Sequence, residues 1–335
     1  METNLSNRLQ AMLLAVFTAG LVLLAVWNFR QEGSFSQPFD GVWWSEAPNG
    51  TGLIAQRILP SSPGAKAALK AGDLLTEVND TPVVRIADLG RILYGVGLYG
   101  SAHYSITRGG IPIETPVLVI PEPEDRSLFQ AERIIGLIYL AIGLYVLFRR
   151  WTAPRAMHFY LFCLVSFALY ALKYTGKLDV LDWTVFWGNH VAEALQPALF
   201  LHFALSFPEE RLRRSGRRAI LPLIYLPGAA VLGLWIWAIT VWQATGLLSH
   251  RLDQVSYAYI GLFYLLAAAQ FLWSYRSANT PLLRQQLKWL TRGTLLAVLP
   301  FTLFYVIPFL LDLRMPDLVT RLSGLSLIFL PLTFS

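Results

Sequence analysis

The chain is poor in cysteine and in charge. Cys163 is its single thiol, so an intramolecular disulfide framework is excluded, and its place inside an apolar stretch indicates a packing role. Charged residues make up 14% of the 335 residues, whereas hydrophobic residues make up 55%. This composition is too apolar for ordinary soluble domains. The sequence therefore predicts a membrane protein.

The motifs of the common membrane enzymes are also absent from the sequence. No His-Glu-x-x-His zinc motif occurs, and the spacing from His190 to Glu193 differs from it. No Gly-x-Ser-x-Gly motif occurs, and Ser101 and Ser323 have no positioned base in the sequence. No catalytic residue, metal site or cofactor is therefore predicted.

Long apolar segments dominate what is present. A membrane-spanning helix needs about 20 mostly apolar residues, and about eight segments approach or exceed this length. They lie at residues 9–28, 134–148, 155–173, 185–207, 220–242, 255–275, 293–311 and 322–335. The first is longer than a signal-peptide core and no Ala-x-Ala site follows it, so we expect a retained anchor. The predicted fold class is a multi-span α-helical membrane bundle.

Positive charge gathers in alternate loops, which predicts the orientation because Lys and Arg are retained on the cytoplasmic side. The basic loops follow the second, fourth and sixth segments. Both chain ends are then cytoplasmic. Since these loops account for most of the net charge of +6, no nucleic-acid partner is expected. The basic residues are Arg149, Arg150, Arg155, Arg211, Arg213, Arg214, Arg217, Arg218, Arg276, Arg284, Lys288 and Arg292.

A soluble, strand-rich region separates the first apolar segment from the second. Residues 41–44 and 53–59 are predicted to form two strands, because Pro-Asn-Gly between them is typical of a turn. A short helix at 65–69 enters from Ser-Ser-Pro-Gly and stops at Ala-Gly-Asp. A strand at 74–80, a second helix at 87–94, and strands at 102–107 and 115–120 around a Gly-Gly hairpin complete a unit of α+β type over 38–121.

This order of elements resembles a bacterial PDZ domain of the periplasmic type. The resemblance rests on Ser-Pro-Gly-Ala, Ala-Gly-Asp, Val-Asn-Asp-Thr-Pro-Val and Arg-Gly-Gly in succession. It implies that a peptide adds as a strand beside residues 42–45, under the helix at 87–94, with its carboxylate at the loop 38–41. A PDZ fold used as a spacer or dimer contact is the alternative. The implied ligand-binding residues are Phe39, Asp40, Gly41, Val42, Trp43, Trp44, Leu89, Ile92 and Leu93.

Asp40 is an unusual occupant of such a loop. Its charge would repel a peptide carboxylate unless the side chain points away. Recognition of an internal segment or of a non-peptide ligand therefore stays open.

Polar residues inside an apolar span are costly and mark candidate functional sites. The fourth segment carries His190, Glu193, Gln196 and His202, and Pro197 shares one helical face with the first two. Pro197 also lacks the N–H that would bond the carbonyl of residue 193, which permits a kink. One interpretation is a ligand or proton-sensing site in the outer half of the bundle. The other is a His190–Glu193 pair satisfied by neighbouring helices.

Three bundle motifs resemble the multi-span sensor region of bacterial histidine kinases and related signalling proteins. They are Leu-His-Phe-Ala-Leu-Ser-Phe-Pro-Glu at 201–209, Arg-Gln-Gln-Leu-Lys-Trp-Leu-Thr-Arg-Gly at 284–293 and Phe-Leu-Pro-Leu-Thr-Phe-Ser at 329–335. One anchor, an outward PDZ module and a bundle is also the layout of peptide-pheromone sensor kinases of competent bacilli.

The resemblance implies a two-component sensor in a bacterial inner membrane. Such a sensor binds an extracytoplasmic peptide or other ligand, forms a homodimer and signals to a cytoplasmic kinase, which is missing from this chain. The implied organisation is an anchor at 1–30, a PDZ-like domain at 38–121, a linker at 122–133 and a seven-span bundle at 134–335. The alternatives are a PDZ-regulated membrane scaffold, a transporter accessory protein or an intramembrane protease.

Overall fold

The computed structural model describes residues 2–122, 126–149, 156–177, 179–207, 222–241 and 246–334. The chain forms two compact units. The helical unit comprises Met1–Arg30, Asp125–Tyr174 and Leu178–Ser335, and the β-sheet unit comprises Gln31–Glu124 and Thr175–Lys177. Each unit has a hydrophobic core of its own.

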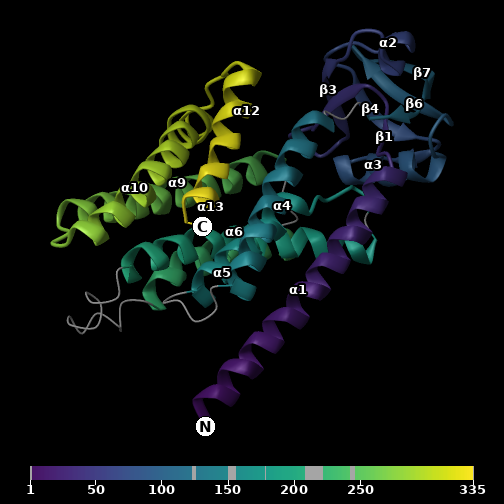
Figure 1. Ribbon diagram of the computed structural model, residues 1–335. Coiled ribbons are helices and arrows are strands. Elements are labelled where there is room, and N and C mark those ends of the chain that lie inside the picture. The colour runs from purple at the N-terminus through teal and green to yellow at the C-terminus, as the bar shows by residue number, and fades with distance from the viewer. Residues whose placement is uncertain are drawn as a thin grey trace. The chain divides into compact units, whose positions relative to one another are not determined.

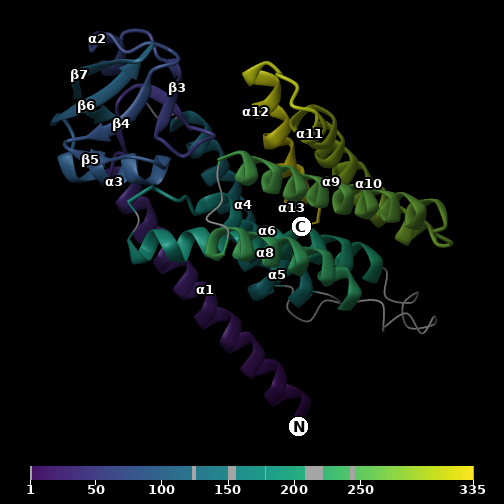
Figure 2. The same ribbon diagram turned by 180° about the vertical axis from the view of Figure 1, so that it is seen from behind.

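The helical unit consists mainly of long helices (Figures 1 and 2). In both views α4 lies beside α5, and α9 lies beside α10. The elements are α1 (Glu2–Ser34, which runs on into the other unit), α4 (Arg126–Arg149), α5 (Ala156–Ala171), α6 (Val180–Ser206), η2 (Pro222–Tyr225), α8 (Leu226–Thr240), α9 (Gly246–Arg276), α10 (Pro281–Phe301), η3 (Thr302–Val306), α11 (Ile307–Leu310), α12 (Asp317–Leu325), η4 (Ser326–Ile328) and α13 (Phe329–Phe334).

Five of these helical stretches are long and apolar enough to cross a membrane. They are Met12–Ser34, Gln130–Arg149, Pro222–Thr240, Leu248–Arg276 and Pro281–Leu310. Helices also occupy the other predicted segments, but α5 has 16 residues, α6 carries several polar side chains and the segment after Pro316 is broken into short pieces. The structure thus shows a multi-pass membrane protein, while the eight-span count stays a prediction.

Parts of the predicted topology and linker lie outside the described residues. Of the basic residues that set the predicted orientation, those at 150, 155, 211, 213, 214, 217 and 218 are outside them. So are residues 123–125 of the predicted linker. Helix α4 begins at Arg126, so the remainder of that linker, up to residue 133, is helical.

Local chemistry explains where several helices begin. Asp179 caps α6, because its Oδ1 accepts a hydrogen bond from the backbone N–H of Asp182 at 2.9 Å. Thr280 caps α10 in the same way through the N–H of Leu283, and Pro281 occupies the first turn, where a missing N–H has no cost.

Helices α6, α8 and α9 approach closely at Gly228 of α8. A Cβ atom at this position would lie 2.3 Å from the carbonyl oxygen of Ala194 and 2.8 Å from the hydroxyl of Tyr259. That hydroxyl donates to the same Ala194 oxygen at 2.8 Å. The interhelical bond falls one turn before Pro197, where the regular helical bonding of α6 is interrupted. A glycine is therefore required on α8 for the three helices to meet.

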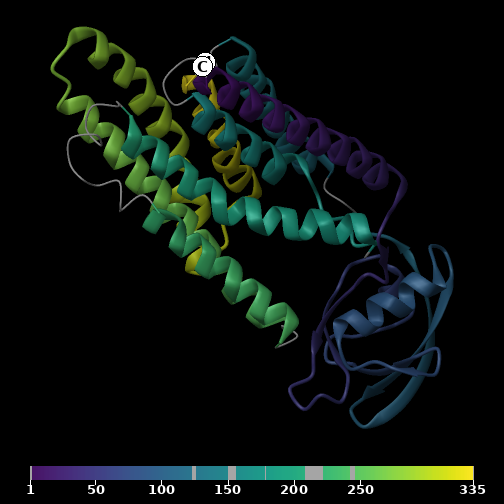
Figure 3. The ribbon, with the colours of Figure 1, turned by 90° about the horizontal axis from the view of Figure 1, so that it is seen from below.

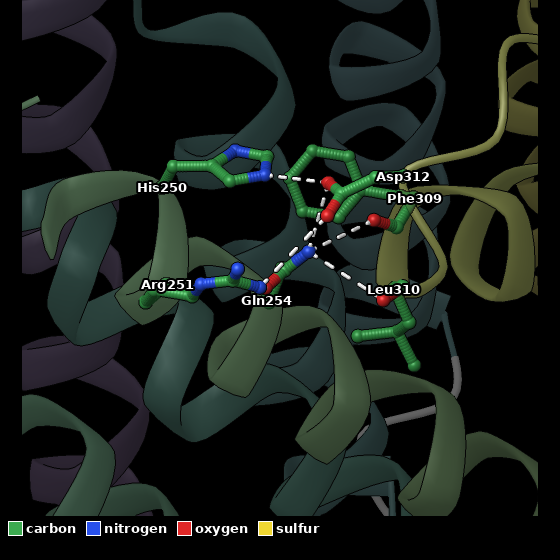
Figure 4. A network of polar contacts seen from close by, with 6 residues as sticks. All are labelled: His250, Arg251, Gln254, Phe309, Leu310 and Asp312. Atoms are coloured by element: carbon green, nitrogen blue, oxygen red, sulfur yellow. Dashed lines mark hydrogen bonds and ion pairs between the residues drawn. The ribbon is translucent and has the colours of Figure 1, made fainter. Parts of the chain in front are cut away.

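A network of polar contacts holds the start of α9 to the turn after α11 (Figure 4). The carboxylate of Asp312 accepts hydrogen bonds from His250 at 2.8 Å and from the Gln254 amide at 3.1 Å. Gln254 also donates to the carbonyl of Phe309 at 3.3 Å. Arg251 approaches the same carboxylate at 3.8 Å. These contacts satisfy carbonyls that the end of α11 leaves without helical donors.

The β-sheet unit contains a six-stranded antiparallel sheet, and Figure 3 shows its second helix, α3, along its length. The strands pair in the order β2-β3-β4-β6-β7, β5 pairs with β4, and β1 pairs with β8 in a separate ladder. The elements are β1 (Pro38–Phe39), β2 (Val42–Glu46), β3 (Leu53–Ile58), α2 (Pro63–Lys66), β4 (Leu74–Val78), β5 (Thr81–Pro82), α3 (Ile86–Val96), β6 (Ser101–Arg108), β7 (Ile111–Leu118) and β8 (Ile120–Pro121).

Alternating apolar residues of these strands form the core of the sheet. Leu53, Leu75 and Tyr104 are fully buried in it. A bidentate ion pair closes one side, because Arg108 contacts both carboxylate oxygens of Asp73 at 2.7 Å. Helix α2 begins where Ser62 accepts a hydrogen bond from the N–H of Ala65.

Candidate functional site

A cavity of about 330 Å³ lies inside the helical unit. Its walls come from α4, α5, α6, α9, α10, η3, α12 and η4, and many of its lining side chains are polar. Polar side chains exposed to a cavity among apolar helices are the usual mark of a binding site in a membrane protein. The polar lining residues are Glu132, Tyr170, Lys173, Asn189, Glu193, Gln196, Asp253, Tyr257, Tyr264, Tyr305, Thr320 and Arg321.

The charges of the cavity are partly compensated. The Lys173 ammonium pairs with the Glu132 carboxylate. Glu193 faces the imidazole of His190, with Nδ1 and Oε2 3.5 Å apart. Within the described part of the chain, the carboxylate of Asp253 has neither a hydrogen bond nor an ion pair. The cavity therefore presents acceptor oxygens that the protein itself does not satisfy.

Tyrosines and an amide form the deeper wall. Gln196 is buried, accepts a hydrogen bond from Tyr264 at 2.6 Å and donates to Ser166 at 3.3 Å. The hydroxyls of Tyr257 and Tyr305 lie 3.1 Å apart, and their rings are 5.3 Å apart. Tyr305 lies on η3, a π-helical segment, and such segments often mark functional positions in helices.

The structure separates the four intramembrane residues that the sequence singles out. Glu193 and Gln196 line the cavity. His190 lies behind Glu193, with its ring centroid 4.5 Å from that of Trp235. His202 belongs to another cluster, where its Nδ1 is 2.8 Å from the Tyr225 hydroxyl. The predicted polar site is thus a pair of cavity residues, one neighbour and one distant histidine.

Sequence reasoning missed most of the cavity. Glu132, Lys173, Asp253 and Arg321 lie near the ends of their segments, where charged residues are common and carry no signal of their own. The α9 contribution has a detectable pattern, because the lining residues of that helix fall on one helical face. They are Asp253, Tyr257, Ile260 and Tyr264.

A second candidate site lies at the start of β2 in the β-sheet unit. Gly41 has a φ of +83°, and a Cβ there would lie 2.2 Å from that of Ser62, so only glycine fits this turn. Asp40 is 2% exposed. Its carboxylate accepts hydrogen bonds from the Val42 N–H at 2.9 Å, the Trp44 indole N–H at 2.8 Å and the Tyr104 hydroxyl at 2.8 Å.

The Asp40 side chain therefore turns into the domain and does not point out of the loop. Burial raises the pKa of its carboxyl above the ordinary value, although the three hydrogen bonds oppose that shift. The buried position also raises the pKa of the Tyr104 hydroxyl well above its ordinary value. The N–H of Val42 is already used by a carboxylate of the chain itself.

Strand β2 has an open edge. It pairs only with β3 among the described strands. Leu59 donates to the Gly41 carbonyl at one end, and Ala47 donates to the Gly52 carbonyl at the other. With the alternation of an antiparallel ladder and the bulge between Trp43 and Trp44, this places the backbone groups of residues 42, 44 and 46 on the side away from β3.

The opposite edge of the sheet is closed by proline. On β7, residue 111 pairs with Arg108 across a two-residue turn, so residues 112, 114 and 116 turn their backbone outward. Pro112 and Pro116 occupy two of these positions and have no N–H to offer. A proline-bearing edge resists the addition of another strand. Of the two edges, β2 alone offers donors and acceptors in alternation.

The predicted peptide-binding residues fall into two groups. Gly41, Val42 and Trp44 lie at or along the open edge, and Phe39 lies on β1, paired with Ile120. Leu89 and Leu93 are each 4% exposed and belong to the core, so they hold α3 in place.

The two remaining predicted residues differ in exposure. Trp43 is 60% exposed, and Ile92 is half-buried against the core. Ile86 and Tyr94, which the sequence analysis did not single out, are the exposed large apolar residues of α3.

The fold and these sites define a multi-pass membrane protein with an α+β domain that resembles a PDZ domain. Comparison with solved structures finds two that are similar to part of this chain. One is the PDZ domain of HtrA3 bound to a phage-derived ligand, FGRWV, with 18% identity, a TM-score of 0.23 and coverage of 25% of this chain and 86% of that chain. The other is the HtrA-type protease AlgW with a decapeptide, with 14% identity and a TM-score of 0.27.

The AlgW match covers 32% of this chain and 36% of the protease chain, so the similarity spans about a third of that protein's length. No protein-family model matches the chain, and no curated protein has a matching sequence.

Proposed function

We propose that this chain is the ligand-sensing membrane region of a signalling protein of the sensor-kinase type, and that its PDZ-like domain receives an extended peptide segment along β2. The observation that carries the proposal is the pair of sheet edges. Strand β2 offers outward backbone groups at residues 42, 44 and 46, whereas proline closes β7. A segment in extended conformation can add to such an edge by main-chain hydrogen bonds.

Side chains beside this edge are suited to an apolar segment. Ile86 begins α3, and its N–H lies 3.4 Å from the Glu46 carboxylate at the end of β2. Ile86 and Tyr94 are both exposed on α3, and the Tyr94 ring centroid lies 6.0 Å from that of Phe35, close in sequence to β1. Pockets for alternate side chains give specificity to strand addition, so we expect the bound segment to carry apolar residues.

The position of the Asp40 carboxylate disfavours binding of a free peptide C-terminus at this edge. This carboxylate accepts the Val42 N–H, the first outward donor of β2. A second carboxylate at the same donor would meet a like charge in a buried position, which is unfavourable. We therefore propose that the domain takes an internal segment of a peptide or protein.

Signal transfer would use the chain connection between the domain and α4. Binding can change the output only if the ligand prefers one of two arrangements of the protein. The kinase assignment is supported by the three bundle motifs alone. Reading the gene beyond codon 335 tests it: an in-frame phospho-acceptor helix with an ATP-binding unit would support a sensor kinase, and a stop codon would favour the scaffold alternative.

Strand addition is tested by proline substitution on the full chain in lipid nanodiscs. A library of extended decapeptides would be screened, and each hit would be prepared with a free and an amidated C-terminus. Glu46→Pro removes an outward N–H of β2, so we expect about a tenfold or greater loss of affinity, measured by fluorescence polarisation. The amidated and free peptides should bind the unmodified chain equally well.

Two variants serve as controls. Glu46→Ala removes the same side chain but keeps the backbone N–H, so it should retain most of the affinity. Glu114→Pro places a proline at the outward position between Pro112 and Pro116 on the other edge and should leave binding unchanged. Equal losses for Glu46→Ala and Glu46→Pro, or binding that requires a free carboxylate, would contradict the proposal.

A further inference from the structure

Several side-chain oxygens of the bundle cavity lack hydrogen-bond donors, and peptide binding at β2 does not involve them. Asp253 has no hydrogen bond or ion pair among the described residues, and the ion-pair partner of Glu193 is the His190 ring at 3.5 Å. The side-chain oxygen of Asn189, which also lines the cavity, is buried without a hydrogen bond, while its amide nitrogen donates to the Leu172 carbonyl at 3.1 Å. Within the described part of the chain, these acceptors are not supplied with donors.

The net charge of the lining residues also favours a cationic ligand. Three carboxylates, of Glu132, Glu193 and Asp253, face two cationic side chains, of Lys173 and Arg321, which gives a formal charge of −1. The Lys173 ammonium is already paired with Glu132. An anionic ligand would add to this negative charge in a low-dielectric setting, where the repulsion is large.

The aromatic wall suits a cation as well. The rings of Tyr257 and Tyr305 lie 5.3 Å apart beside the acidic group of α9, and both line the cavity. Aromatic faces attract ammonium groups, and the attraction increases when water is excluded. A volume of about 330 Å³ limits the ligand to a small molecule.

We propose that this cavity is a binding site for a small organic cation with N–H donors, a primary amine or diamine, held by the carboxylates of Glu193 and Asp253 and the tyrosine wall. The inference goes beyond the proposed peptide recognition, because it concerns the other unit of the protein. The cationic ligand supplies the charge and the donors that these acceptors lack. Its binding stabilises the helical unit by mass action.

The test uses the full chain in nanodiscs with putrescine as the probe. Saturating putrescine should raise the unfolding temperature of the bundle by several degrees. Three compounds of similar size separate the contributions: 1,4-butanediol has no charge, tetramethylammonium has no N–H donor, and 4-aminobutyrate adds a carboxylate. We expect no shift with butanediol and a smaller shift with each of the other two.

Isosteric variants identify the site. Asp253→Asn and Glu193→Gln should each reduce the apparent affinity for putrescine at least tenfold, and each serves as a second test if the other fails to fold. Asp317→Asn, at an exposed carboxylate at the start of α12, is the matched control and should bind as the unmodified chain does.

Several outcomes would overturn the inference. They are the absence of a shift with putrescine, an equal shift with butanediol, a larger shift with 4-aminobutyrate, or a shift that persists in both cavity variants. None of these results bears on peptide binding at β2, and loss of peptide binding in Glu46→Pro leaves the amine test unaffected. The two proposals therefore fail separately.

Discussion

Two buried carboxylates of the β-sheet unit respond to pH in opposite directions. Asp40 lies among neutral donors, and burial raises the pKa of its carboxyl, so its contribution to stability is largest at low pH and is lost as the pH rises through the folded-state pKa. The Arg108 guanidinium beside Asp73 lowers the pKa of that carboxyl. Its contribution is therefore present above the ordinary pKa and is lost in acid.

The Asp73–Arg108 pair should control the acid sensitivity of the sheet. As the pH falls from the ordinary pKa of 3.8 through the lower folded-state value, protonation of Asp73 breaks its bidentate contact. We expect protection of β4 and β6 from hydrogen exchange, corrected for the intrinsic rate, to fall over this range. In Asp73→Asn the protection should be lower at neutral pH, by roughly 1–3 kcal/mol, and should no longer fall in acid.

Asp80→Asn is the control for this measurement. Asp80 is an exposed turn residue with a φ of +58°, a conformation that asparagine tolerates. This variant should keep the acid sensitivity of the unmodified chain. A steep acid transition that survives in Asp73→Asn would show that another group is responsible.

Residue-level prediction from the sequence was limited by partners that are distant along the chain. The sequence shows that Asp40 is unusual, but not that Trp44 and Tyr104 would hold its carboxylate inside the domain. It indicates Glu193 and Gln196 by their cost within a span, whereas Asp253 near the start of α9 carries no such signal. Cavity residues from several helices become neighbours only through tertiary packing.

At the scale of helices, the meeting of α6, α8 and α9 depends on the small residue on α8. Gly228→Ala would place a methyl group 2.3 Å from the Ala194 carbonyl oxygen, which forces the helices apart. We expect destabilisation by about 1–3 kcal/mol, seen as a lower unfolding temperature of the bundle. Separation of the helices should also weaken the Tyr259 hydrogen bond to Ala194.

Gly233 on the same helix provides the matched control. No atom lies within 4 Å of a Cβ built there. Gly233→Ala should therefore be neutral or stabilising by up to about 1 kcal/mol, since alanine has the higher helix propensity. Equal effects of the two alanine substitutions would mean that the close approach at Gly228 does not limit stability.

Element positions followed from the sequence more closely than single contacts did. The helices predicted at 65–69 and 87–94 correspond to Pro63–Lys66 and Ile86–Val96, because turn residues and apolar periodicity mark them locally. Strands β1, β5 and β8 have two residues each, too few for any periodicity, and they exist through pairing with other segments. The π-helical turn η3 between Pro300 and Pro308 also lacks a local signal.

For the whole molecule, length and composition show five candidate membrane helices, while the apolar segments and loop charges of the sequence predict eight spans. The difference concerns α5, α6 and the α12–α13 segment. Helix α6 is too polar for a span that faces lipid on all sides. Several of its polar side chains, however, face the cavity or neighbouring helices and not lipid. A helix surrounded by other helices can cross a membrane with such residues, so its low hydropathy does not argue against a span.

Single-cysteine labelling decides between the two counts. The chain has one cysteine, Cys163, which is buried, so Cys163→Ser gives a background without thiols. With eight spans, Asn49→Cys and Lys177→Cys react with an impermeant maleimide on intact cells, and Asn279→Cys reacts only after permeabilisation. All three positions are exposed on the protein. If neither α5 nor α6 crosses, as in the count of five, Asn49→Cys and Lys177→Cys fall on opposite sides of the membrane.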